Sequence, residues 1–176
     1  VCSSDLLPPL TRIPFVFPPS SSQVVREATL EQAKALLDKW VVEIVQDIST
    51  PGFYSRFFVV QKRDSSAWRS ILDLSNLNRH LVKKKFKMET AESIRAVLNQ
   101  GEWVTSLDLS DAYFHVPVHR AHRKYLRFTC QGMVLQFRVL PMGLSDSARV
   151  FSRVGGSTKK FVQSQGLVLH QYLDDW

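Results

Sequence analysis

Apolar residues between Ala33 and Ile48 recur every three or four positions, which is the spacing of one face of an α-helix. Thr29 and Gln32 have capping-box spacing at the start of this pattern, and a Ser-Thr-Pro-Gly stretch directly follows its end. The preceding residues 1–28 are rich in proline and serine, a composition typical of extended chain. The pattern therefore predicts an extended lead-in followed by one amphipathic helix.

Six shorter apolar runs have the length and residue types of β-strands: 56–60, 68–74, 103–109, 125–130, 133–140 and 166–173. A polar stretch separates the first two runs, and Gln131-Gly132 separates the fourth from the fifth, so each pair predicts a β-hairpin. Further helices are predicted over 91–99, with Thr90 as N-cap, and from about Ser145. Because strands and helices mix without strict alternation, we expect an α+β fold with a mainly antiparallel sheet.

Composition narrows the class of protein. Of the 176 residues, 44% are apolar and 22% charged, the balance of an ordinary globular domain. The net charge of +7 suits a polyanionic partner such as nucleic acid, although a solvated basic surface gives the same sum. Two cysteines without metal-type spacing disfavour a disulfide scaffold or a zinc module. No apolar run approaches the roughly 20 residues of a membrane helix, so no membrane partner is expected. The opening VCSSDL (1–6) resembles a translated sequencing adapter and is left out of the fold prediction.

Carboxylates stand at the ends of two predicted strands. Asp108 lies at the last register of one, and the adjacent Asp174 and Asp175 directly follow another. An Asp pair at a strand end is usually a solvated turn, but if these strands are neighbours all three acids meet at one sheet edge. Clustered carboxylates repel one another unless a cation neutralises them, and Mg²⁺ prefers such oxygen ligands. Two ions roughly 4 Å apart would stabilise the attacking and leaving oxygens of a phosphoryl transfer.

Four segments together resemble one enzyme family. LDLSDAYF (107–114) and YLDD (172–175) resemble motifs A and C of reverse transcriptases. LPMGLSDSARVF (140–151) resembles motif B, and QKRDSSAWRSILDLSNLN (61–78) resembles the fingers segment. The order and separation of the four segments are those of the family, and the resemblance runs from about residue 13 to the end of the sequence. Among members, the sequence is most similar to retrotransposons of the DIRS-like group, with long-terminal-repeat elements second.

This resemblance implies an RNA-directed DNA polymerase with reverse-transcriptase-like fingers over residues 29–100 and a palm over residues 101–176. It implies that Asp108, Asp174 and Asp175 hold two Mg²⁺ ions, for which Mn²⁺ could substitute. Asp175 would matter less as a direct ligand, and the carbonyl of Leu109 would add one. The implied partners are dNTPs and an RNA or DNA primer–template.

The resemblance also assigns nucleotide contacts. Lys62 and Arg69 would grip the triphosphate, since Arg offers a bidentate fork and Lys a point charge. The remaining implied contacts are the backbone amides of Asp111 and Ala112, the ring of Tyr113 as a steric gate against the ribose 2′-OH, and Met142 and Gly143 against the nucleotide and template base. KKKFK (83–87) and HRAHRK (119–124) are candidate phosphate contacts for the primer–template.

Two other readings of the sequence stay open: a non-enzymatic, nucleic-acid-binding remnant of a decayed element, and another palm polymerase. The catalytic hairpin needs a return strand after Asp175, so we expect the palm to be truncated after the YLDD strand and the 176 residues alone to be inactive. An intracellular location is expected, with cytoplasm and nucleus both open.

Overall fold

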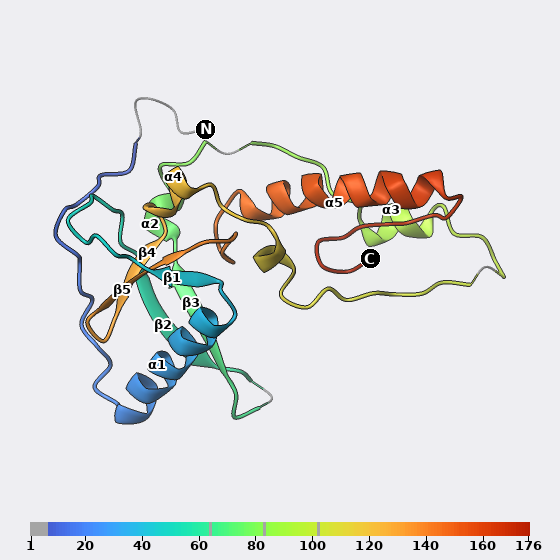
Figure 1. Ribbon diagram of the computed structural model, residues 1–176. Coiled ribbons are helices and arrows are strands. Elements are labelled where there is room, and N and C mark those ends of the chain that lie inside the picture. Colours follow the sequence, from blue (N-terminus) through green and yellow to red (C-terminus); the bar gives the residue numbers. More distant parts are fainter. Residues whose placement is uncertain (1–6, 64, 83, 102) are drawn as a thin grey trace.

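The structure is a computed structural model that describes residues 7–63, 65–82, 84–101 and 103–176 (Figure 1). Its elements, in chain order, are α1 (Gln23–Asp38), β1 (Val42–Ile44), β2 (Arg56–Gln61), β3 (Trp68–Asp73), α2 (Ser75–Asn78), α3 (Ala91–Arg95), the 3₁₀ helix η2 (Ala112–His115), α4 (Arg120–Arg123), β4 (Arg127–Cys130), β5 (Met133–Phe137) and α5 (Ser147–Ser164). None of the helices in these described ranges is long and apolar enough to cross a membrane.

The strands form two antiparallel sheets, which confirms the predicted α+β class. One sheet has the order β1-β5-β4, and the other is the β2–β3 hairpin. The β4–β5 turn has positive φ at Gln131 (46°) and Gly132 (80°), as the mirror-image turns of tight hairpins require. Both predicted hairpins are therefore present. The β4–β5 turn matches the twist of the strands that it joins. In both hairpins the predictive signal is the polar stretch between two apolar runs, which is local in the sequence.

One hydrophobic core joins α1 to both sheets. The rings of Phe57 in β2 and Phe128 in β4 stack with centroids 4.4 Å apart, which connects one sheet to the other. Ala33 and Leu36 of α1 are buried in the same cluster, together with Leu135 of β5. Burying side chains of this size contributes about 1.5–3 kcal/mol each. In Figure 1, α5 extends away from the two sheets, and the C-terminal segment runs along it.

The predicted first helix over residues 29–48 is wrong in both bounds. α1 begins inside the predicted lead-in, and the Val-Glu-Ile segment assigned to the helix is strand β1. The helix ends because Trp40 adopts a left-handed φ of 58°, and the N–H groups of Trp40 and Val41 donate back to its last turn. The β-branched residues that follow are then free to pair with β5.

The strands predicted over 103–109 and 166–173 are also wrong as regular elements. Each retains only an isolated bridge, at Asp108 and at Tyr172. Trp103 and Val168 are strongly exposed, as are the neighbouring apolar residues of both runs. The physical reason is pairing: within the part of the chain that the structure describes, these runs meet a backbone partner only at their carboxylate ends.

The remaining two helix predictions are confirmed with changed bounds. Thr90 caps α3 as predicted, in a capping box with Ser93, although α3 is shorter than the predicted 91–99. α5 begins two residues after Ser145 and continues through Gly155 and Gly156 without a break. Two interior glycines ordinarily weaken a helix, so their presence here needs a structural reason.

The two glycines of α5 have different surroundings. A Cβ on Gly155 would collide with the buried side chain of Gln171, whereas a Cβ on Gly156 would meet open space. Gly155 therefore lets the segment before Tyr172 pack closely against α5. This contact positions the chain that leads into Asp174.

We expect Gly155→Ala and Gly156→Ala to have opposite effects. Gly156→Ala should raise the free energy of unfolding by about 1 kcal/mol through helix propensity. Gly155→Ala should lower it by about 1–3 kcal/mol, because the buried Gln171 side chain must move. Urea unfolding of both variants tests this, and equal stabilisation by the two substitutions would contradict the packing role of Gly155.

Candidate active site

Backbone hydrogen bonds bring the two carboxylate-bearing segments side by side. Leu107 and Trp176 exchange both N–H···O bonds, at 2.7 and 2.9 Å, and the N–H of Leu109 donates to the carbonyl of Asp174 at 3.0 Å. Asp108 is thereby the antiparallel bridge partner of Asp175. The predicted meeting of the two segments at one edge is confirmed for the backbone.

A tight turn presents the Asp pair. Tyr172 and Asp175 exchange two backbone hydrogen bonds, at 2.8 and 2.9 Å, around Leu173 and Asp174. Leu173 has φ 53°, a left-handed conformation that costs a non-glycine residue about 1–2 kcal/mol. Backbone strain of this kind is common at functional sites, where the surrounding structure holds the residue in the unfavourable conformation.

The three carboxylates have no cationic partner among the residues that the structure describes. Asp108, Asp174 and Asp175 are all exposed, and none makes a side-chain hydrogen bond or ion pair among the described residues. Their oxygens are the ligand type that Mg²⁺ or Mn²⁺ takes, so the donor set fits such an ion chemically. The described His, Cys, Asp and Glu side chains nevertheless include no group of three already arranged around a metal position.

A cavity of about 580 Å³ gathers five of the predicted nucleotide-binding residues: Lys62, Arg69, Asp111, Met142 and Gly143. Its walls come from α1, the β2–β3 hairpin, η2 and the loop after β5. Two positive side chains from one hairpin therefore face the loop that resembles motif B. This arrangement suits an anionic, flat ligand, since the charges sit on one wall and apolar groups on another.

The loop after β5 is held by α2. The Asn78 side chain donates to the carbonyl of Gly143 at 2.8 Å and accepts from the N–H of Ser145 at 2.9 Å. Gly143 has φ 88°, which favours glycine, and its carbonyl must point at Asn78 to make this bond. The sequence analysis missed Asn78, and its place inside the fingers-like segment, five residues after the end of β3, gave no sign of the contact.

Lys39 was also missed. It lines the same cavity and donates to the Asp111 carboxylate at 2.7 Å. Both side chains are about half exposed, so the pair adds little stability by itself. Asp111 has a left-handed φ of 54° at the start of η2, and the contact with Lys39 fixes its carboxylate there. The sequence analysis missed Lys39 because the helix was predicted to continue past it, whereas α1 ends at Asp38.

Ala112 and Tyr113 do not line this cavity. Ala112 is buried, and the Tyr113 ring makes an edge-to-face contact with Phe151, with centroids 5.4 Å apart. Burial, and then the negative charge of Asp174, raise the pKa of the Tyr113 hydroxyl above its ordinary value. Tyr113 therefore lies between the core under η2 and the Asp174 carboxylate. Its role as a steric gate, and that of the Ala112 amide, stay predictions.

Glu89 anchors the segment that leads into the turn. Its carboxylate pairs with Lys159 of α5, lies 3.3 Å from His170 and accepts from the N–H of Gln171 at 2.8 Å. Burial tends to raise the pKa of Glu89, but the hydrogen bonds from Lys159 and Gln171 and the two neighbouring positive groups outweigh it, so the pKa is lowered. The ionised carboxylate thus ties α5 to the chain just before Tyr172.

The two basic runs lie on different surfaces. Within KKKFK, residues 84–87 line a groove with Arg149 and Arg153 of α5, while Lys83 lies outside the described residues. HRAHRK instead forms α4, next to β1 and the β4–β5 sheet. A contact to a primer–template stays a prediction for both runs. Because the runs line different grooves, the structure does not indicate that one duplex would contact both of them.

With the geometry established, the comparison with known families adds the class of protein. A family model described as reverse transcriptase (RNA-dependent DNA polymerase) matches residues 60–176, well over half of the chain. The chain therefore belongs to the reverse transcriptase family. The matched residues include the last two residues of β2, all of β3, most of the cavity and all three carboxylates. By family it is an RNA-directed DNA polymerase, a class that in general binds primer–template and dNTPs and uses divalent metal ions.

The Glu89 contacts predict a pH-dependent stability. The pKa of Glu89 in the folded chain is below its ordinary value of 4.5, so its contribution is complete above about pH 4.5 and is lost as the pH falls through the folded-state pKa. Glu89→Gln should therefore destabilise the chain near neutral pH and change little at about pH 3. Urea unfolding at both pH values measures this.

The matched control is Glu31→Gln, which removes an exposed carboxylate from α1. It should change stability little at either pH. An equal loss at both pH values for Glu89→Gln would show that the shape of the side chain, and not its charge, holds the segment.

Proposed function

We propose that the chain is the fingers and palm portion of a retrotransposon reverse transcriptase, most similar to the DIRS-like group. It would catalyse nucleotidyl transfer from dNTPs to a primer 3′-OH on an RNA or DNA template. Asp108, Asp174 and Asp175, with the carbonyl of Leu109, are the proposed metal ligands. The observation that carries the proposal is the cavity that gathers Lys62, Arg69, Asp111, Met142 and Gly143. Asp111 follows Asp108, the bridge partner of Asp175, by three residues.

The positive side chains of the cavity would bind the triphosphate. Arg69 and Lys62 come from paired strands, since Arg69 is the register partner of Val60 and Lys62 directly follows β2. The N–H of Lys62 donates to the carbonyl of Ala67 at 2.9 Å, which closes the hairpin tip and limits its motion. Charge-assisted hydrogen bonds from two such groups orient a phosphate chain without reorganisation of the protein.

The other wall would position the nucleotide. Met142 is exposed at the loop after β5, and Asn78 fixes the loop at Gly143. Close backbone approach at Gly143 leaves room for a flat base. Mg²⁺ bound by the carboxylates would supply charge neutralisation at the reacting phosphate. The side chains of the protein would thus contribute orientation, and the paired segments would contribute the negative site that holds the ion.

One observation favours the second candidate, a nucleic-acid-binding remnant without catalysis. The described acidic side chains form no ready metal-binding group, and the runs before Asp108 and Asp174 leave their apolar residues exposed. Such a remnant would bind nucleic acid in a salt-sensitive way but would not incorporate nucleotides. Metal-dependent synthesis separates the two candidates.

The test is primer extension by the native protein that contains this chain, on an RNA template with dNTPs and Mg²⁺. Asp108→Asn and Asp174→Asn should each lower the rate by at least about a thousandfold, because the loss of a carboxylate ligand removes several kcal/mol of transition-state stabilisation. Asp38→Asn, which removes an exposed carboxylate at the end of α1, is the matched control. Extension that survives both substitutions, or salt-sensitive binding without any incorporation, would contradict the proposal.

A further inference from the structure

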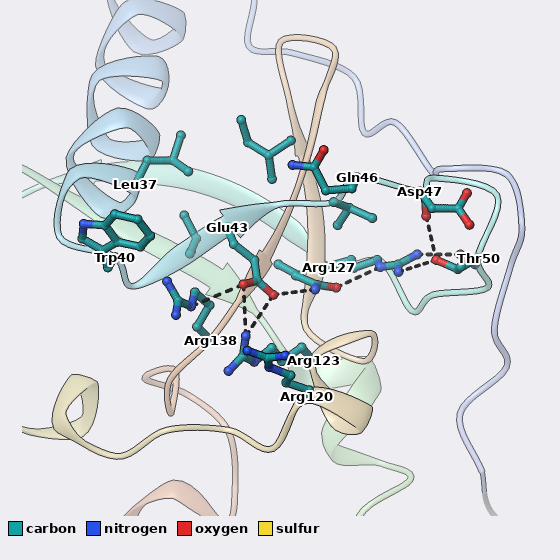
Figure 2. A pocket seen from close by; sticks show the side chains of 14 residues that line it. Leu37, Trp40, Glu43, Gln46, Asp47, Thr50, Arg120, Arg123, Arg127 and Arg138 are labelled. Carbon is teal, nitrogen blue, oxygen red and sulfur yellow. Dashed lines mark hydrogen bonds and ion pairs between the residues drawn. The ribbon is translucent and has the colours of Figure 1, made fainter.

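A second cavity shares no lining residue with the cavity that contains Lys62 and Arg69. It contains none of the residues predicted to hold the metal ions or the nucleotide, but Arg120 and Arg123 belong to the run predicted to contact phosphates. It has a volume of about 700 Å³ and is bounded by β1, α4 and the β4–β5 sheet (Figure 2). Its charged lining consists of Arg120, Arg123, Arg127, Arg138, Glu43 and Asp47. We call it the arginine pocket. Four guanidinium groups against two carboxylates leave an excess of two positive charges.

The Glu43 carboxylate forms ion pairs with two of the arginines. Glu43 pairs with Arg123 at 3.0 Å and with Arg138 at 3.3 Å, and it also accepts from Gln136 at 2.8 Å. Arg120 is exposed at the rim, and no described residue gives it a hydrogen bond or an ion pair. The internal contacts of the pocket therefore leave positive charge unmatched, and some of it faces solvent.

Arg127 is the buried arginine of the arginine pocket. It is 4% exposed, and its guanidinium donates only to neutral oxygens: the carbonyl and hydroxyl of Thr50 at 2.6 and 2.8 Å, and Gln136 at 3.2 Å. No carboxylate among the described residues lies within ion-pair distance of it. Hydrogen bonds from Ser49, and then the charge of Arg127, lower the pKa of Asp47, so Arg127 has an anionic neighbour beyond ion-pair distance. Among the described residues of the pocket, the arginine that keeps its charge free for a bound anion is therefore Arg120 at the rim.

Space for Arg127 is reserved by Gly52. A Cβ at that position would come within 2.5 Å of the Arg127 side chain. The absence of a side chain at residue 52 therefore leaves room for the buried guanidinium at the wall of the pocket. It also indicates that the sequence specifies the position of Arg127.

Trp40 stands at the other end of the pocket. It is 73% exposed and has a left-handed φ of 58°, a conformation in which glycine is ordinarily preferred. The Arg138 guanidinium lies 5.3 Å from the centroid of its ring. A large apolar side chain is therefore both strained and exposed, and its outer face is open for stacking (Figure 2).

We propose that the arginine pocket binds single-stranded nucleic acid, with a backbone phosphate near Arg120 and a base stacked on Trp40. An aromatic platform beside unmatched arginines is the combination that single-strand binding uses, since every base has a flat face and every linkage a charge. A free anion or an acidic peptide would use the arginines alone and would leave Trp40 without a role. The pocket is separate from the proposed dNTP cavity, so a template or product strand could occupy it while the other cavity is filled.

The first test is fluorescence anisotropy with a labelled RNA of about 12 nucleotides, a length within the range of single-strand sites. Trp40→Ala should weaken binding about tenfold, and Arg120→Ala should weaken it and reduce the salt slope by about 0.7, the value of one phosphate contact. Trp103→Ala and Arg95→Ala remove an exposed tryptophan and an exposed arginine from other segments, and neither should weaken binding to this extent.

A second variant separates binding from folding. Trp40→Gly should raise thermal stability, because glycine accepts the left-handed conformation, and should still weaken RNA binding. This binding is measured without dNTPs and without Mg²⁺, so a failure of the polymerase proposal would not count against the pocket. Unchanged affinity in both Trp40→Ala and Arg120→Ala would overturn the inference.

Photocrosslinking gives the position directly. A 4-thiouridine RNA should crosslink to peptides that contain Trp40 or α4. Crosslinks confined to residues 84–87 and α5 would overturn the inference, because the RNA would then bind the other basic groove. Displacement by polyglutamate as strong as by RNA, and unaffected by Trp40→Ala, would also overturn it in favour of an acidic protein partner.

Discussion

The short backbone pairing between Leu107–Leu109 and Asp174–Trp176 is the constraint on which the candidate active site depends. Without these three hydrogen bonds, the carboxylates would sit on two unrelated loops. With them, Asp108 and Asp175 become partners in one antiparallel β-bridge, and their carboxylates have no cationic partner in the described chain. Carboxylate oxygens are the ligand type that Mg²⁺ takes, and this pairing is therefore where we propose that the metal ions bind.

Contacts far from the carboxylates maintain this pairing and the nucleotide cavity. Gly155 and Glu89 bring the segment before the turn against α5, and Asn78 holds the motif-B-like loop from the side of the fingers hairpin. The hairpin itself is fixed to the core through the stacked rings of Phe57 and Phe128. The nucleotide cavity is thus built by elements that each pack on the common core, so its charged wall does not depend on a free loop.

The sequence predicted the parts of the fold whose signals are local. The hairpins at Gln131-Gly132 and between β2 and β3 followed from turn chemistry. The resemblance to reverse-transcriptase motifs selected five residues that share one cavity. The end of α1 was missed because Trp40 takes a conformation that its residue type disfavours. Lys39 and Asn78 act through partners that lie 72 and 65 residues away, and no periodicity reveals such contacts. The arginine pocket is likewise assembled from three separate segments.

The central claim is that the cavity lined by Lys62 and Arg69 holds the triphosphate of a dNTP. The most direct measurement is equilibrium binding of a fluorescent dATP analogue with Mg²⁺ to the chain and to Arg69→Ala, with Arg56→Ala as a control on the same hairpin but outside the cavity. The account predicts a loss of affinity of about tenfold to a hundredfold for Arg69→Ala, because a hydrogen bond to a charged group contributes about 1.5–3 kcal/mol, and little change for Arg56→Ala. Equal affinities for Arg69→Ala and the unchanged chain would contradict it.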